Sequence, residues 1–187
     1  MKVRRLRDIL NKPFTIKDLV SGYTNNDDGV TTDSVLGYNG KLNIRPSYQR
    51  NNVYSDEKNQ AVIRTILDEC PIGIMYWVDL GNGKYEVLDG QQRILAICNY
   101  VIGNYSVKSN KFPSSVPQQD FPNLQVNLKD IADKILDYEL DIYICEGTPS
   151  EKMKWFHVIN TAGEPLNEQE LRNSAYTGAW LSDAKQR

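Results

Sequence analysis

The sequence predicts an α+β domain, in which a mixed sheet is flanked by helices, and three observations support this fold class. Two runs of strand-forming residues, 74–80 and 84–88, flank Gly81-Asn82-Gly83, a combination typical of a β-hairpin. The second run leads directly into residues 94–102, whose apolar positions follow helical periodicity. Residues 138–145 alternate apolar and polar side chains, which indicates a strand with one solvent-facing side.

Capping residues, glycines and prolines bound the other expected elements. Residues 14–20 predict a short helix with Thr15 as its cap. Residues 108–127 contain three prolines and are expected to form a long surface loop, either a lid or a variable segment. The remaining elements are a strand at 42–45, a helix at 56–70 after Ser55 or Asp56, and C-terminal helices at 150–160 and 168–176.

Charge along the chain is almost balanced, which limits how it could hold a nucleic acid. Lys and Arg number 22 and Asp and Glu 24, so the net charge of −2 gives no general basic field. Residues 1–20 gather basic side chains, which fits either a basic arm or a solvated terminal segment. These are Lys2, Arg4, Arg5, Arg7, Lys12 and Lys17. One domain over residues 1–187 is expected, with a helical C-terminal part at 148–187.

Cysteine usage and hydropathy both favour a cytoplasmic protein. Cys70, Cys98 and Cys145 are odd in number and far apart, which fits reduced thiols better than disulfides or zinc ligands. All three lie among apolar neighbours and are expected to be small core residues. The amino terminus has no apolar stretch after its charged residues, and no run of 18 apolar residues occurs, so neither a signal peptide nor a membrane span is expected.

The most informative stretch is Asp89-Gly90-Gln91-Gln92-Arg93, where the second hairpin strand passes into a helix. A turn through glycine leaves the first N–H groups of that helix without partners, and with the helix dipole they suit an anion. Arg93 adds a planar set of donors that fits two phosphate oxygens at once. Asp89 could hold a hydrated Mg²⁺ shared with the phosphates. The stretch therefore predicts a phosphate site.

A simpler explanation of the same stretch is that Asp89 or Gly90 caps the helix and that Gln91, Gln92 and Arg93 are solvated first-turn residues. Two amides and an arginine in succession contribute little to packing, however. At the carboxyl end of a strand, where open sheets bind ligands, they indicate polar recognition.

Several familiar sites are excluded by their missing residues. The sequence contains neither GxxxxGK[ST] nor GxGxxG, so the two common phosphate-binding loops are absent. His157 is the only histidine, which excludes histidine-rich zinc sites and an HNH nuclease within this sequence. No GxSxG motif supplies a serine nucleophile. Counting from Gly29 as the sixth position of a calcium loop places Thr24 first and Val35 twelfth, where carboxylates are required.

The remaining polar residues form one constellation. Gln49 and Arg50 follow the strand at 42–45, the stretch from Asp89 to Arg93 follows the hairpin, and Asn160 lies at a helix end. If the two strands are neighbours with their carboxyl ends on one side, these groups converge on one cleft. Arginines, amides and a carboxylate would suit a Mg²⁺-bound di- or triphosphate, with the amides orienting a water or reading a base edge.

Three blocks of this sequence resemble those of the GmrSD-type N-terminal domain, the DGQQR-motif family with a ParB- and sulfiredoxin-like fold. The blocks are Ile44-Arg45-Pro46-Ser47-Tyr48-Gln49-Arg50, Asp89-Gly90-Gln91-Gln92-Arg93, and Phe156-His157-Val158-Ile159-Asn160 followed by Gly163, Leu166, Glu170, Leu171 and Arg172. They span most of the chain in the family's order. Tyr54 departs from the family, which commonly has tryptophan there, and the motif lacks the cysteine that sulfiredoxin activity needs.

The resemblance implies a nucleotide-binding and NTP-hydrolysing domain of prokaryotic restriction systems that attack modified foreign DNA. Asp89, Gln92 and Arg93 would be catalytic, with Asp89 also holding Mg²⁺. Tyr48, Gln49, Arg50, Gly90, Gln91, Arg93 and Asn160 would bind the nucleotide, expected to be GTP, CTP or UTP. The nuclease of such systems is usually a C-terminal or separate HNH domain, so the chain is expected to be a fragment of a longer protein.

Two further hypotheses come from other functional classes. In one, the chain is a ParB-like DNA-binding module whose motif helix and basic amino-terminal segment touch phosphates without catalysis, which predicts binding that weakens steeply with salt. In the other, the chain is a scaffold in which the motif only caps a helix.

Overall fold

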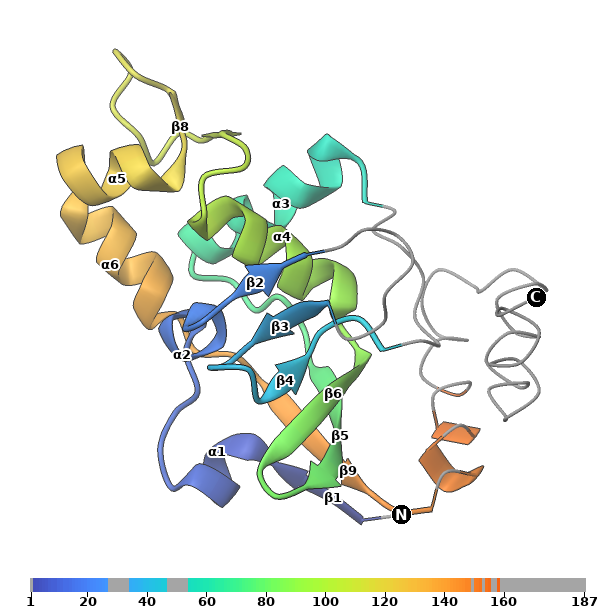
Figure 1. The fold of residues 1–187 in the computed structure, drawn as a ribbon. Coiled ribbons are helices and arrows are strands. Elements are labelled where there is room, and N and C mark those ends of the chain that lie inside the picture. Colours follow the sequence, from blue (N-terminus) through green and yellow to red (C-terminus); the bar gives the residue numbers. More distant parts are fainter. Residues whose placement is uncertain are drawn as a thin grey trace, which may run out of the picture.

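The computed structural model describes residues 2–26, 34–46, 54–148, 150–152, 154, 155 and 158, and the predicted α+β fold class is confirmed there. The described strands form a seven-stranded mixed sheet in the order β1-β9-β5-β6-β4-β3-β2 (Figure 1). Their bounds are β1 Lys2–Arg5, β2 Thr24–Asn25, β3 Val35–Gly37, β4 Leu42–Asn43, β5 Met75–Gly81, β6 Lys84–Asp89 and β9 Ile142–Glu146. A small second sheet pairs β7 (Val107–Lys108) with β8 (Gln118–Gln119).

The β5–β6 hairpin lies in the middle of the sheet and determines its topology. Its turn is made by Gly81, Asn82 and Gly83, all at positive φ, as the sequence predicts. β6 pairs in parallel with β4, in the register Leu42 with Tyr85, while β5 pairs in parallel with β9. Because β4 and β6 are parallel, their carboxyl ends lie at the same end of the sheet.

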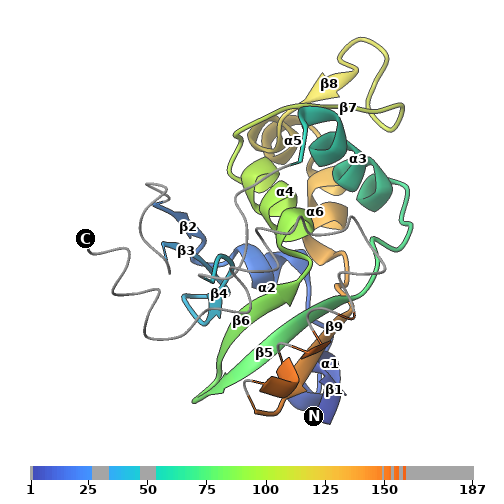
Figure 2. The same cartoon turned by 90° about the vertical axis from the view of Figure 1, so that its right-hand side faces the viewer.

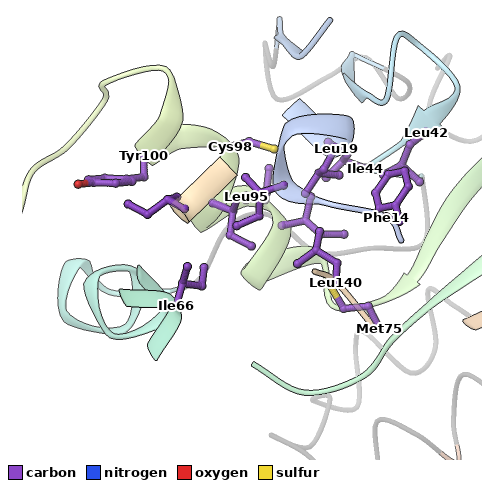
Figure 3. Packing of buried hydrophobic residues seen from close by; sticks show 14 of the residues in the cluster. Phe14, Leu19, Leu42, Ile44, Ile66, Met75, Leu95, Cys98, Tyr100 and Leu140 are labelled. Atoms are coloured by element: carbon purple, nitrogen blue, oxygen red, sulfur yellow. The ribbon is translucent and has the colours of Figure 1, made fainter. Parts of the chain in front are cut away.

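One face of the sheet carries the main core and most of the helices. The helices are α1 Leu6–Leu10, α2 Ile16–Val20, α3 Asp56–Leu67, α4 Gln91–Val101, α5 Phe121–Asn127 and α6 Lys129–Asp137. Thr15 caps α2 as predicted, and Ser55 caps α3. Figure 3 shows Leu19 of α2, Ile66 of α3 and Leu95 of α4 within this core. Since α4 is packed on this buried body, its amino end is held in place.

The opposite face of the sheet has a second, smaller apolar cluster. Val78, Leu88 and Cys145 are buried there, with Tyr76 and Trp155 packed against them. Trp155 belongs to the helical turn that starts near residue 150, which Figure 2 shows beside β5 and β9. Thr148 and Glu151 form a capping box at its start. The expected solvent-facing side of the strand at 138–145 is thus partly covered, and the strand begins only at Ile142.

Residues 1–20 were expected to be a basic arm or a solvated terminal segment, and neither alternative predicted the strand with which they begin. β1 forms the edge of the sheet, antiparallel to β9, and α1 follows it. The strand was not predicted because every residue of β1 is exposed, so no apolar alternation marks it. Its arginines are anchored on β9, with Arg4 bonded to Glu146 and Arg5 donating to the Tyr143 hydroxyl at 2.8 Å.

Residues 108–127 are also more ordered than a surface loop. The turn between β7 and β8 is followed by α5, which begins at the cap Asp120 and buries Phe121 and Leu124. Pro122 lies in the first turn of that helix, where a missing N–H has no cost. The helix predicted at 94–102 ends at Val101, and Ile102, the last apolar residue of that pattern, is 48% exposed.

Two expectations about the wider chain have different outcomes. Among the described residues, no helix has the length and apolar character needed to cross a membrane. The expected helix at 168–176 and most of the one at 150–160 lie outside the described residues. The division of the chain into parts stays a prediction.

The cysteines lead to a labelling prediction. Cys98 and Cys145 are buried as predicted, whereas Cys70 is exposed, contrary to its predicted core position. Burial raises the pKa of the Cys98 thiol above its usual range and that of Cys145 to about 11. At pH 8 an aromatic disulfide reagent should therefore label Cys70 quickly in the native protein and the other two only in denaturant. Absorbance of the released thiolate measures this, and Cys70→Ser should remove the native signal. Fast native labelling of that variant would contradict the described burial.

Candidate functional site

The passage from β6 to α4 depends on Gly90. Its φ of +96° lies in the left-handed region, and it serves as the residue before the first turn of α4. A Cβ built on Gly90 would lie 2.5 Å from Cγ of Met75, so a side chain there would displace the neighbouring strand. Gly90 has no side chain, so the residue at the N-cap position of α4 makes no capping hydrogen bond. The site therefore lies at the amino end of α4, where the first-turn backbone N–H groups and the positive end of the helix dipole are.

The two glutamines of the motif are buried, with exposed fractions of 3% for Gln91 and 9% for Gln92. Gln91 Nε2 donates to the carbonyl oxygen of Ile44 at 3.3 Å, and Gln92 Nε2 donates to Gln91 Oε1 at 3.2 Å. Gln92 Oε1 accepts the backbone N–H of Tyr54 at 3.3 Å. The interpretation of these glutamines as solvated first-turn residues is wrong, because tertiary partners far away in sequence hold their amides inside.

These hydrogen bonds connect two distant stretches of chain to the start of α4. Ile44 follows β4, and Tyr54 precedes the cap of α3. The chain on either side of residues 47–53 is therefore attached to adjacent glutamines. Tyr48, Gln49 and Arg50, predicted to bind the nucleotide, fall within that interval and lie outside the described residues, as do His157 and Asn160.

Arg93 and Asp89 form an ion pair across the first turn. Arg93 Nη2 donates to Asp89 Oδ2 at 2.9 Å, and Nη1 donates to the Ile72 carbonyl oxygen at 2.9 Å. The side chains are 20% and 31% exposed, so the pair is accessible from solvent on one side. A guanidinium has five N–H donors, and these two bonds leave three without a partner among the described residues. The guanidinium is thus fixed in orientation and retains donors for a ligand.

Ile72 and Gly73, which precede β5, also belong to the site, and the sequence analysis did not identify them. Gly73 lies at φ +88°, and a Cβ there would be 2.9 Å from Arg93 Nη1. Its missing side chain makes room for the guanidinium, and the Ile72 carbonyl fixes it. The glycine after Pro71 and Ile72 was the available signal, but glycine commonly marks an ordinary turn.

Among the described residues the site offers a magnesium ion one carboxylate, that of Asp89, so its further ligands would have to come from water and a bound phosphate. Within the described ranges, no group of three or more His, Cys, Asp or Glu side chains could hold a metal ion. Mg²⁺ commonly keeps several waters and takes one or two carboxylates plus substrate phosphates. Asp89, with one oxygen bonded to Arg93 and the other without a described partner, can supply one such carboxylate.

Comparison with known proteins places this site in a family. Residues 16–177 match the family described as GmrSD restriction endonuclease, N-terminal domain. The chain belongs to this family. Membership confirms the resemblance drawn from the three motif blocks and makes the GmrSD N-terminal domain a module of a restriction or defence protein. The curated proteins gave no match. The solved structures gave none either, so the ParB- and sulfiredoxin-like character of the fold stays a prediction.

The Gly90 contact gives a stability prediction. Gly90→Ala combines an unfavourable positive φ with the Met75 clash and should lower the free energy of unfolding by about 2–4 kcal/mol. Gly83→Ala is the matched control, because Gly83 is also at positive φ but its Cβ would meet nothing within 4 Å; its cost should be about 1 kcal/mol. Urea unfolding followed by circular dichroism measures both. Equal costs would show that the Met75 contact contributes nothing.

The buried amides of Gln91 and Gln92 give a second stability prediction. Gln91→Met keeps the side-chain length but removes the hydrogen bond to the Ile44 carbonyl and the one accepted from Gln92 Nε2, which should cost about 1–3 kcal/mol. Gln118→Met on the exposed strand β8 is the control and should change the unfolding free energy by less than about 0.5 kcal/mol. The same urea experiment compares them, and a neutral Gln91→Met would disprove the role given to this amide.

Proposed function

We propose that the amino end of α4 binds the polyphosphate of a nucleoside triphosphate together with Mg²⁺, and that the domain hydrolyses it as part of a restriction system. The observation that carries the proposal is the Arg93 guanidinium, held by two hydrogen bonds beside the positive amino end of α4. Both supply N–H donors and positive charge in one place, which is what phosphate oxygens require. The family supplies the restriction context.

Charge at the site argues for a metal-bound ligand. Asp89 and Arg93 are 2.9 Å apart and cancel each other, so a bare phosphate would meet a neutral pair with a carboxylate close by. Asp89 would hold Mg²⁺ through its second carboxylate oxygen, and the charge of that ion would offset the repulsion between the carboxylate and the phosphates, while Arg93 offers its remaining donors to the phosphate oxygens. Nucleotide affinity should therefore depend on the metal. Mg²⁺ would also stabilise the charge that develops during phosphoryl transfer.

The roles of the motif residues follow from their contacts. Asp89 would hold the metal and Arg93 the transferred phosphoryl group, and Gly90 and Gln91 would give the backbone its approach to the phosphates. Gln92, expected to orient a water, has its amide committed to Tyr54 and Gln91, which supports a positioning role. Tyr48, Gln49, Arg50 and Asn160 remain predicted nucleotide-binding residues on the strength of the family motif.

The alternative, a ParB-like DNA-binding module, has less support from the described residues. Half of the six basic side chains in its amino-terminal segment are paired with carboxylates, Arg4 with Glu146, Arg7 with Glu139 and Lys12 with Asp18. Modified DNA and an HNH nuclease remain expected partners of the restriction system, and neither has a binding surface assigned by these contacts.

Titration calorimetry with GTP, CTP, UTP and ATP tests the proposal. Wild-type protein should bind at least one of them with Mg²⁺ and lose most of the affinity in EDTA. Arg93→Ala should weaken binding by about 10- to 100-fold, the value of a charge-assisted hydrogen bond. Asp89→Asn should remove the dependence on Mg²⁺.

Arg64→Ala is the matched control, since Arg64 is also paired with a carboxylate, Glu57, but lies on α3 away from the motif. It should bind nucleotide as wild type does. Circular dichroism of each variant checks that the fold is retained. Failure of the wild type to bind any of the four nucleotides, or equal binding by folded Arg93→Ala, would refute the proposal.

A further inference from the structure

A row of side chains crosses the sheet and ends at the proposed phosphate site. In the strand register Arg5 of β1 is opposite Tyr143 of β9, Tyr143 is beside Tyr76 of β5, and Tyr76 is opposite Asp89 of β6. We call these four residues the transverse row. Directly opposed residues on neighbouring strands have Cβ atoms close together, so the row is continuous.

The contacts along the transverse row agree with the register. The Arg5 guanidinium lies over the Tyr143 ring at 5.5 Å and donates to its hydroxyl. The rings of Tyr143 and Tyr76 have centroids 5.9 Å apart at an interplanar angle of 39°. Burial, followed by smaller electrostatic contributions that include Asp89, raises the pKa of Tyr76. Both tyrosine residues have intermediate solvent exposure.

Trp155 adds an unused hydrogen-bond donor to this row. Its ring meets Tyr76 edge-on at 6.0 Å, with an interplanar angle of 80°. Its indole Nε1 is buried and has no hydrogen-bond partner among the described residues. A buried N–H without an acceptor is unfavourable, so a bound group that offers one would be stabilised. Trp77 Nε1 in the main core is also buried without a partner, and the difference is that Trp155 lies against the partly exposed row.

The spacing of the row matches a nucleotide. Strands lie about 4.8 Å apart, so Tyr143 is two strand spacings from Asp89. Phosphates held at Asp89 and Arg93 would leave the ribose over β5 and the base over the rings of β5 and β9. Every base has a π face that stacks on an aromatic ring and an acceptor that an indole N–H can reach.

We propose that Tyr76 and Tyr143 form the platform on which the base of the nucleotide stacks, and that Trp155 Nε1 donates to the edge of that base. This inference depends on the proposed function, because it takes the phosphate end of the ligand to be at Asp89 and Arg93. Arg5 closes the far end of the platform and holds the Tyr143 ring in place. The platform assigns base binding to β1, β5 and β9, whereas the phosphates lie at β6 and α4.

Binding of Mg²⁺-GTP and Mg²⁺-UTP, compared with Mg²⁺-tripolyphosphate, tests the platform in the full chain. Tripolyphosphate has the phosphates but no base. Tyr143→Leu should weaken both nucleotides by roughly 5- to 150-fold, the value of one stacked base, and leave tripolyphosphate unchanged. Tyr143→Phe keeps the ring and should bind both nucleotides nearly as wild type does. Arg93→Ala should weaken all three ligands.

Tyr38→Leu is the matched control for loss of a partly buried ring. Tyr38 packs edge-on against Phe14 at 5.0 Å, away from the transverse row, so its removal should lower stability without changing nucleotide affinity. A second readout does not depend on a variant that folds. Photolysis of bound 8-azido-GTP should attach the base to a peptide containing Tyr76, Tyr143 or Trp155, identified by mass spectrometry.

The possible failures are distinguishable. If wild type binds neither nucleotide nor tripolyphosphate, the proposed function fails. If Arg93→Ala weakens all ligands but Tyr143→Leu weakens none of them, or weakens tripolyphosphate equally, the phosphate site stands and the platform is wrong. Cross-linking that is confined to other peptides would also show that the platform is wrong. Binding of a single-stranded oligonucleotide that survives Arg93→Ala and is lost in Tyr143→Leu would assign the row to nucleic acid and overturn the nucleotide assignment.

Discussion

The close approach of Gly90 to Met75 is the constraint on which the site depends. With no side chain between them, α4 begins one residue after the end of β6 and turns back over the core face of the sheet. The body of the helix is then fixed by the buried residues Ile94, Leu95 and Ile97. Its amino end cannot move without disturbing this packing, so donors placed there are preorganised for a ligand.

The buried amides extend this constraint to the rest of the site. Gln91 and Gln92 are polar, yet they are inside because each finds a backbone partner, the Ile44 carbonyl and the Tyr54 N–H. Satisfied amides in a core specify position more strictly than apolar side chains do, since a shifted partner leaves a group unpaired. The two glutamines therefore make the ends of β4 and the start of α3 dependent on the start of α4. A ligand at this point would contact elements that are far apart in sequence.

Local signals predicted the parts of the fold that local physics determines. The glycine turn between β5 and β6, the Thr15 cap of α2 and the passage from strand to helix at Gly90 were all predictable, because a few adjacent residues decide each of them. Non-local pairing was not predictable. β1 is a strand only because β9 provides its partner, and the glutamines are buried only because Ile44 and Tyr54 meet them. The place of Ile72 and Gly73 in the site was not predictable either, because it depends on their contacts with Arg93, which is distant in sequence.

The register of the sheet explains how one small domain could recognise both ends of a nucleotide. A row perpendicular to the strands takes one residue from each strand, so its chemistry changes stepwise across the sheet: a carboxylate at β6, rings at β5 and β9, and a guanidinium at β1. A nucleotide has the same order of groups, from metal-bound phosphates through ribose to an aromatic base. β1 lies before the residues that match the family, yet it holds the ring at the far end. In the proposed binding mode, base recognition at that edge would therefore vary independently of phosphate binding at α4, since the two depend on different strands.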